Sequence, residues 1–279
     1  MIVYMFPGQG SQHPGMGKEL FESYPEYVEK ADEVLGHSLA ELCLQESDPR
    51  LNRTEFTQPA LFAVNVLSYL RRIEDSGRFP DWVVGHSLGE YNALFAAGVF
   101  DFETGLRLVQ RRGQLMSQAS GGGMAAVIGL PADEVLSRLR AAGLDGIDIA
   151  NHNAPRQIVI AGPSDDIDRA AELFQSPARC VRLRVSGAFH SRQMRAPRDA
   201  FGEFVRTQRL RAPRLPVIAN ATAQPYSDER LAETLVEQIA SPVRWTEILD
   251  YLKHRGAQEF VEIGPGTVLT NLLREHAAA

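Results

Sequence analysis

Trp82-Val83-Val84-Gly85-His86-Ser87-Leu88-Gly89 is an apolar run that leads into a serine between two glycines. The pattern fits a nucleophile elbow, a tight turn from a strand into a helix that lifts a serine hydroxyl into a cleft. Residues 90–97 have a helical pattern, so the serine would also lie at the positive N-terminal end of a helix. An ordinary strand-to-helix turn has the same pattern, and the rest of the chain must decide between the two.

The elements predicted around this turn alternate between strand and helix, which indicates an α/β core. Helices are predicted around 26–44, at 58–74 and at 101–119, the last with Asp101 as its N-cap. Strands are predicted at 2–6, at 82–85, near Val217 and near Phe260.

The stretch after Gly121-Gly122-Gly123 has a different order of predicted strands and helices. It predicts strand 124–129, helix 132–142, strands 147–150 and 157–161, helix 165–175 and strand 180–185. This βαββαβ order is the ferredoxin-like split pattern. We therefore expect a core of residues 1–121 and 188–279, with a small ferredoxin-like subdomain inserted at 122–187.

Composition excludes several classes of protein. The chain has 279 residues, 44% of them hydrophobic and 23% charged, as in ordinary globular proteins. Its net charge of −6 argues against a nucleic-acid partner bound by phosphate neutralisation. No apolar run reaches membrane length, and the first residues lack the pattern of a signal peptide. With Cys43 and Cys180 in apolar stretches, we expect buried thiols in a cytoplasmic monomer.

A serine nucleophile needs a neighbouring base, most often a histidine. Of the seven histidines, His190 stands out because it lies in the loop 186–191, where the chain leaves the predicted insertion. Such a loop would line the cleft between the two parts, a favoured place for ligands. A capping or surface role is the alternative. His86 lies inside the elbow, which should turn its ring away from the hydroxyl.

The loop Pro7-Gly8-Gln9-Gly10-Ser11-Gln12 follows the first strand. It resembles the start of a dinucleotide fingerprint, but His13 occupies the place of the third glycine and no βαβ unit follows. Two interpretations remain, a plain tight turn and a loop whose N–H groups bind an anion, as an oxyanion hole requires. The sequence holds no metal-binding motif and no P-loop, so neither a metal nor a cofactor is expected.

Arg112 projects into the apolar face of the helix predicted at 101–119, among Leu108, Val109 and Met116. Burying an unpaired guanidinium costs several kcal/mol, so it needs a partner. Periodicity alone favours neither a protein carboxylate nor a ligand carboxylate, and the side chain could also extend to the surface.

Seven motifs lie along nearly the whole chain: Pro7-Gly8-Gln9-Gly10-Ser11-Gln12, Thr57-Gln58-Pro59-Ala60, Gly85-His86-Ser87-Leu88-Gly89-Glu90, Arg112-Gly113, Ala188-Phe189-His190-Ser191, Ser241-Pro242-Val243-Arg244-Trp245 and Glu262-Ile263-Gly264-Pro265-Gly266. Together, and in this order, they resemble the malonyl-CoA:acyl carrier protein transacylase family. The resemblance implies an α/β-hydrolase-like core with a ferredoxin-like insertion. This is the organisation expected above.

The resemblance also implies roles for individual residues. Ser87 would be the nucleophile and His190 its base, a dyad that is oriented by the backbone carbonyl of Gln238. The backbone N–H groups of Gln9 and Leu88 would hold the oxyanion.

Three further residues would contact the substrate. By resemblance, Arg112 would pair with the free carboxylate of a malonyl group, and Gln58 and Phe189 would line the acyl site. Leu88 and Phe189 match the family members that take malonyl rather than methylmalonyl groups, because the phenyl ring fills the space of an α-methyl branch. Gly187 departs from the histidine that is commoner at this position.

The implied reaction is transfer of a malonyl group from malonyl-CoA to the phosphopantetheine thiol of an acyl carrier protein, with an acyl-enzyme on Ser87. The implied setting is a discrete, trans-acting acyltransferase of polyketide biosynthesis, with fatty-acid biosynthesis as the alternative. Two other functions compete: an editing acyl hydrolase of the same fold, and a non-catalytic subunit that docks carrier proteins.

Overall fold

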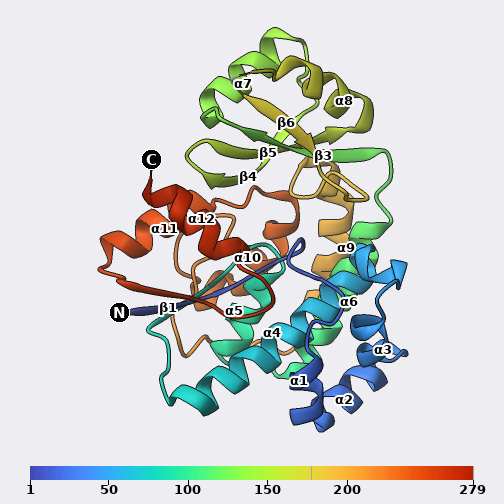
Figure 1. The fold of residues 1–279 in the computed structure, drawn as a ribbon, viewed down its shortest axis with the longest axis vertical. Coiled ribbons are helices and arrows are strands. Elements are labelled where there is room, and N and C mark those ends of the chain that lie inside the picture. The colour runs from blue at the N-terminus through green and yellow to red at the C-terminus, as the bar shows by residue number, and fades with distance from the viewer. Residues whose placement is uncertain (177, 279) are drawn as a thin grey trace.

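Two β-sheets organise the chain, one parallel and one antiparallel (Figure 1). The structure, a computed structural model, describes residues 1–176 and 178–278. The parallel sheet has the order β2 (Trp82–Gly85), β1 (Ile2–Phe6), β7 (Glu259–Glu262). Val3–Phe6 of the central strand are buried, as expected for a parallel strand that is covered on both faces.

Helices surround the parallel sheet (Figure 1). They are α1 (Lys18–Ser23), α2 (Pro25–Leu35), α3 (Leu39–Leu44), α4 (Thr54–Ser76), α5 (Gly89–Ala96), α6 (Phe102–Ser117), α9 (Arg195–Val205), α10 (Leu231–Glu237), α11 (Trp245–His254) and α12 (Val268–Ala277). Short 3-10 turns lie at Pro49–Asn52, Arg192–Met194, Asp228–Arg230 and Gln238–Ala240. None of the helices in the described ranges is long and apolar enough to cross a membrane.

The antiparallel sheet comes from the stretch after the three glycines. Its strands are β3 (Gly122–Ile128), β4 (Asp148–Ala154), β5 (Gln157–Pro163) and β6 (Arg179–Arg182), in the order β4-β5-β3-β6. α7 (Ala132–Ala141) and α8 (Ser164–Leu173) pack on one face and enclose a separate apolar core (Figure 1). The predicted βαββαβ order of elements is confirmed, and β4 is the strand nearest the parallel sheet in Figure 1.

Two predicted elements are wrong. The helix expected around 26–44 is broken, because Gly36 adopts a left-handed conformation (φ 76°) that ends α2, and Ser38 caps a new helix at Leu39. The strand expected near Val217 is a single parallel bridge to Val83. The chain turns back there, since Ala219 N donates to Gln224 O at 2.9 Å.

Two other helices agree more closely with their predicted ranges. The helix expected at 58–74 begins four residues earlier, at Thr54, with Pro59 inside its second turn. The helix expected at 101–119 spans 102–117, and its predicted cap is confirmed because the Asp101 carboxylate accepts from Thr104 N at 2.9 Å.

Candidate active site

The elbow places Ser87 where β2 ends and α5 begins. Ser87 has a φ of 53°, in the left-handed region that serine rarely adopts. A Cβ on Gly85 would lie 1.9 Å from the backbone carbon of Gly89, and a Cβ on Gly89 would lie 2.0 Å from Phe6 O. Only glycine fits at either position, so the two glycines make this strained turn possible and bring it against the end of β1.

Ser87 and His190 form a hydrogen-bonded pair, with 2.7 Å between Ser87 Oγ and His190 Nε2. On the other side of the ring, His190 Nδ1 lies 3.0 Å from the main-chain oxygen of Gln238 and 3.1 Å from that of Ser241. Carbonyl oxygens only accept hydrogen bonds, so Nδ1 carries the proton and Nε2 is left to accept the proton of the Ser87 hydroxyl. The pair therefore has the arrangement of a nucleophile and its base.

The surroundings keep this imidazole neutral. His190 is 4% exposed, and burial together with the nearby Arg112 guanidinium lowers the pKa of His190 to about 3. A neutral ring is the form that can take a proton at physiological pH.

Arg112 lies beside the nucleophile and is 1% exposed, so its side chain does not extend to the surface. Nη1 donates to Gln58 Oε1 at 2.6 Å, and Nη2 donates to Gln238 Oε1 at 2.9 Å and to Ser87 Oγ at 3.2 Å. The guanidinium also lies over the ring of Tyr91, 5.5 Å from its centroid.

The partners of Arg112 leave its charge without a direct counter-ion. Across residues 1–176 and 178–278, no carboxylate forms an ion pair with Arg112, and its buried Nε has no hydrogen-bond partner. The sequence allowed a protein carboxylate or a ligand carboxylate as the partner of Arg112. Among the described residues, no protein carboxylate takes this place. The site can accept a negative charge.

A cavity of about 140 Å³ lies in front of the pair. Seven of the eight predicted site residues line it: Gln9, Gln58, Ser87, Leu88, Arg112, Phe189 and His190. The eighth, Gln238, lies behind His190 and Arg112 and contacts both. Residues from β1–α1, α4, the elbow, α6 and the loop before α9 thus meet at one place, as the sequence predicts.

Gln9 and Leu88 line this cavity from two loops, and each has a backbone N–H group. Within the part of the chain that the structure describes, neither N–H has a hydrogen-bond partner. Gly8 lets the loops approach, because a Cβ there would lie 2.4 Å from His86 O and 3.6 Å from Leu88 N. The two donors are therefore free to bind an oxygen atom beside Ser87.

His86 also lines this cavity, but its ring bonds to Asn153 rather than to the Ser87 hydroxyl. Its Nε2 lies 2.8 Å from Asn153 Oδ1 on β4, and its ring packs against Trp245 at 5.5 Å between centroids. Loss of solvation lowers the pKa of His86, so it adds no positive charge to the site at neutral pH.

Behind the elbow lies a buried polar network that the sequence does not predict. Glu90, in the first turn of α5, accepts from Tyr226 Oη, from Asn220 N at 3.1 Å and from Gln238 Nε2 at 3.0 Å. Burial raises the pKa of Glu90 to about 7. The glutamate belongs to one of the quoted motifs, but its partners lie 130 to 148 residues away and no local pattern connects them.

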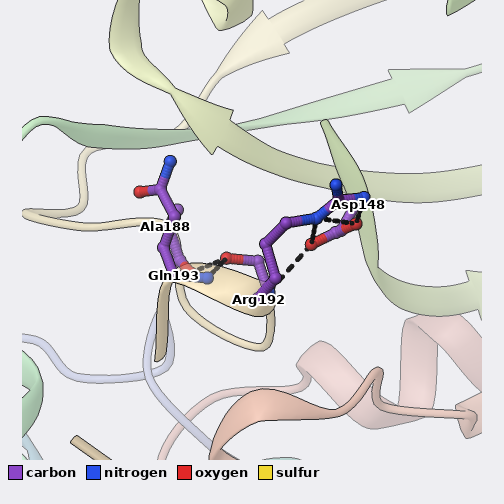
Figure 2. A network of polar contacts seen from close by, with 5 residues as sticks. Asp148, Ala188, Arg192 and Gln193 are labelled. Carbon is purple, nitrogen blue, oxygen red and sulfur yellow. Dashed lines mark hydrogen bonds and ion pairs between the residues drawn. The ribbon is translucent and has the colours of Figure 1, made fainter. Parts of the chain in front are cut away.

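The loop that carries His190 is held from both ends (Figure 2). Arg192 forms an ion pair with Asp148 at 2.5 Å, and its backbone N donates to the same carboxylate at 2.8 Å. Ser191 Oγ donates to Ala188 O at 2.6 Å and accepts from Gln193 N at 3.2 Å. Figure 2 shows Arg192 reaching from this loop to Asp148 on β4, so the antiparallel sheet is tied to the segment beside His190.

No group of three or more histidine, cysteine or acidic side chains in the described ranges could hold a metal ion. The groups that the site offers are the Ser87 hydroxyl paired with His190, the Arg112 guanidinium without a carboxylate partner, and two backbone N–H donors.

Comparisons with known proteins identify the class. The chain matches the acyl transferase domain family over residues 3–278. It is 52% identical to the polyketide biosynthesis malonyl CoA-acyl carrier protein transacylase PksC of Bacillus subtilis, over 98% of this chain and 96% of that protein. The chain therefore belongs to the acyl transferase domain family, among the malonyl-CoA:acyl carrier protein transacylases.

Two further matches agree. A malonyl CoA-acyl carrier protein transacylase from Burkholderia pseudomallei has a solved structure with a TM-score of 0.97 and 49% identity, covering 100% of this chain and 98% of that one. The polyketide biosynthesis protein PksE of Bacillus subtilis is 52% identical over 98% of this chain, but the chain spans only 36% of its length. The mixed α/β fold with a parallel and an antiparallel sheet is that of malonyl transacylase structures.

Proposed function

We propose that the chain transfers a malonyl group from malonyl-CoA to the phosphopantetheine thiol of an acyl carrier protein, in polyketide biosynthesis. The observation that carries this proposal is the position of Ser87 Oγ, 2.7 Å from His190 Nε2 and 3.2 Å from Arg112 Nη2. In a malonyl group a single methylene separates the free carboxylate from the thioester carbonyl. An arginine next to the nucleophile therefore suits a carboxylate on the reacting acyl group.

In the first half of the reaction, Ser87 Oγ attacks the thioester carbonyl of malonyl-CoA while His190 Nε2 takes the hydroxyl proton. The free N–H groups of Gln9 and Leu88 stabilise the oxyanion that forms. The C–S bond then breaks, the proton passes from His190 to the sulfur, and CoA leaves as a thiol. A malonyl ester remains on Ser87.

In the second half, the phosphopantetheine thiol of the carrier protein attacks this ester. His190 takes the thiol proton and returns it to Ser87 Oγ as the ester bond breaks. Arg112 holds the malonyl carboxylate in both halves, and Gln58 fixes the guanidinium through its bond to Nη1 at 2.6 Å. Each step balances without a metal or cofactor, so we propose that none takes part.

The polyketide setting rests on the names of PksC and PksE, both 52% identical to this chain. The carrier protein as acceptor rests on the name of PksC. The cytoplasmic location and the monomeric state that the sequence predicts stay predictions.

We also propose that the domain division expected from the sequence applies. An α/β-hydrolase-like core of residues 1–121 and 188–279 would carry the ferredoxin-like subdomain 122–187, although residues 177 and 279 lie outside the described chain. The strand order β4-β5-β3-β6, the two helices on one face and the separate apolar core support this division.

The proposal is tested by incubating the protein with malonyl-CoA and measuring its intact mass. We expect a gain of one malonyl group in the unsubstituted protein, none in Ser87→Ala, and loss of the group when a carrier protein with phosphopantetheine is added. A malonyl adduct on Ser87→Ala would refute the proposal. Rapid release to water would favour the editing hydrolase, and no adduct on the unsubstituted protein would favour the docking subunit.

A further inference from the structure

Gln238 contacts all three chemical groups of the site. Its main-chain oxygen accepts from His190 Nδ1, its Oε1 accepts from Arg112 Nη2 at 2.9 Å, and its Nε2 donates to Ser87 O at 2.7 Å. The side chain is fully buried, so no water replaces any of these contacts. The orientation of this one amide therefore affects where the Arg112 guanidinium lies.

The amide of Gln238 has one orientation that satisfies every neighbour. Its NH₂ group faces two acceptors, Ser87 O and the carboxylate of Glu90, the latter at 3.0 Å from Nε2. Its oxygen faces Arg112, which has only donors. If the amide turned over, NH₂ would face the guanidinium and the oxygen would face a carbonyl and a carboxylate. Buried like groups that face one another without hydrogen bonds are costly.

Glu90 is itself held so that it can accept. Asn220 N donates to the same carboxylate oxygen, Oε2, at 3.1 Å, and Tyr226 Oη donates to Oε1. Asn220 is fixed in turn, since its Oδ1 accepts from Ser87 N and its Nδ2 donates to Gly85 O, both at 2.7 Å. The network thus begins and ends on the backbone of the elbow.

We propose that Glu90 is a positioning residue, which acts through the side-chain amide of Gln238 to hold Arg112 where it receives the carboxylate of the acyl group. This inference rests on the malonyl transfer proposed above. Glu90 contacts Gln238, is not among the residues that line the cavity, and touches no reacting atom. Its effect should therefore appear in the choice between acyl groups with and without a carboxylate.

The hydrogen bond from Gln238, rather than the charge of Glu90, is the essential part of this role. A glutamine at position 90 can still accept from Asn220 N and Gln238 Nε2 with its oxygen, and its NH₂ can donate to the Tyr226 hydroxyl. A methionine at position 90 fills similar space but offers no comparable acceptor. Glu90→Gln is thus the matched variant that restores what Glu90→Met removes.

The experiment measures the rates at which Ser87 is acylated by malonyl-CoA and by acetyl-CoA, which lacks the carboxylate. In Glu90→Met, we expect the ratio of malonyl to acetyl loading to fall about 10- to 100-fold, the range expected for one hydrogen bond to a charged group. In Glu90→Gln the ratio should return close to that of the unsubstituted protein. A general structural defect would lower both rates together and leave the ratio unchanged.

Gln238→Met provides a second, independent variant, because it removes the amide and keeps the main-chain oxygen that contacts His190. It should lower the ratio as Glu90→Met does, and the double variant should lose no more than either single one, since both act through one bond. If thermal denaturation shows that Glu90→Met is not folded, an unchanged ratio in Gln238→Met would still overturn the inference.

Three results would overturn the inference: an unchanged ratio in Gln238→Met, an unchanged ratio in folded Glu90→Met, or a loss in Glu90→Gln as large as in Glu90→Met. The last would assign the role to the charge. These failures differ from a failure of the proposed function, in which the unsubstituted protein would show no preference for malonyl-CoA over acetyl-CoA.

Discussion

The main-chain oxygen of Gln238 lies 3.0 Å from His190 Nδ1, and it takes the place that a carboxylate holds in a serine–histidine–aspartate triad. A carbonyl orients the ring and fixes its tautomer but adds no negative charge. In the proposed reaction the imidazolium would therefore be stabilised less than it is beside a carboxylate, and the resting ring loses its proton more readily. The pKa of His190, lowered to about 3 by burial and by Arg112, is consistent with this environment.

The first prediction concerns the pH dependence of malonyl loading. Because His190 stays neutral well below its usual pKa of 6.5, loading should show no loss of rate centred near that value between about pH 5 and 8. Rapid-mixing measurements of acyl-enzyme formation would test this. A change near pH 7 that disappears in Glu90→Gln would belong to Glu90. A change near pH 6.5 that persists in that variant would contradict the prediction.

The second prediction concerns stability. Burial raises the pKa of Glu90 from 4.5 to about 7, so between these values the folded state holds a proton that the unfolded state has released. This contribution to stability is present below pH 4.5 and is lost as the pH rises through about 7. The free energy of unfolding, relative to Glu90→Gln, should therefore fall by about 3 kcal/mol over this range.

Denaturant titrations of the two proteins at several pH values would measure this difference. The comparison cancels the other titrating groups, because Glu90→Gln keeps the same hydrogen bonds with Asn220, Gln238 and Tyr226. A difference that does not vary with pH would show that Glu90 titrates normally or stays ionised.

Much of the fold and the site could be predicted because the signals are local. Asp101 lies three residues before the N–H that it caps, and the glycines of the elbow lie within five residues of each other. The side-chain direction of Arg112 follows from helical periodicity alone. These features depend on neighbours in the chain, which one sequence displays.

The features that could not be predicted depend on contacts between distant segments. The residues around Val217 have the composition of a strand. Val217 nevertheless forms only a single bridge, to Val83, because the chain turns back at Ala219. The end of α2 at Gly36 is different, because a glycine in a left-handed conformation is a local helix-stop signal that the prediction of one helix around 26–44 does not use. In the sequence, Glu90 resembles any acidic residue in the first turn of a helix. Only the folded chain brings Tyr226 and Gln238 into contact with it.

The third prediction concerns the size of the acyl group. Phe189 is buried and lines the 140 Å³ cavity together with Leu88. Phe189→Ala should raise methylmalonyl loading relative to malonyl loading by about 10-fold or more, because one methyl group in a tight pocket is worth about 1 to 3 kcal/mol. Phe174→Ala, in the separate core of the antiparallel sheet, removes the same atoms away from the cavity and should leave the ratio unchanged. Equal ratios in both variants would refute the steric role.

The fourth prediction concerns the elbow. Gly89→Ala should prevent correct folding or lower stability by more than about 4 kcal/mol, because its Cβ would lie 2.0 Å from Phe6 O and the backbone on both sides would have to move. Gly143→Ala is a control for backbone strain without a close contact, since Gly143 has a positive φ of 66° but no atom within 4 Å of its Cβ position. The control should cost about 1 kcal/mol, from backbone strain alone. Similar costs for the two variants, measured by thermal and denaturant unfolding, would refute the close approach.

The fifth prediction compares the two contacts that hold the His190 loop (Figure 2). The side chain of Arg192 is 52% exposed, so Asp148→Asn should lower the free energy of unfolding by less than about 1 kcal/mol, and less in high salt. Ser191 is buried, and Ser191→Ala leaves Gln193 N and Ala188 O without their partner, which should cost about 1 to 3 kcal/mol. Because Ser191 adjoins His190, this variant should also slow malonyl loading more than Asp148→Asn does. Denaturant unfolding and loading rates measured on both variants test the order, and a larger effect of Asp148→Asn on both would show that the tie to β4, rather than the internal bonds of the loop, positions His190.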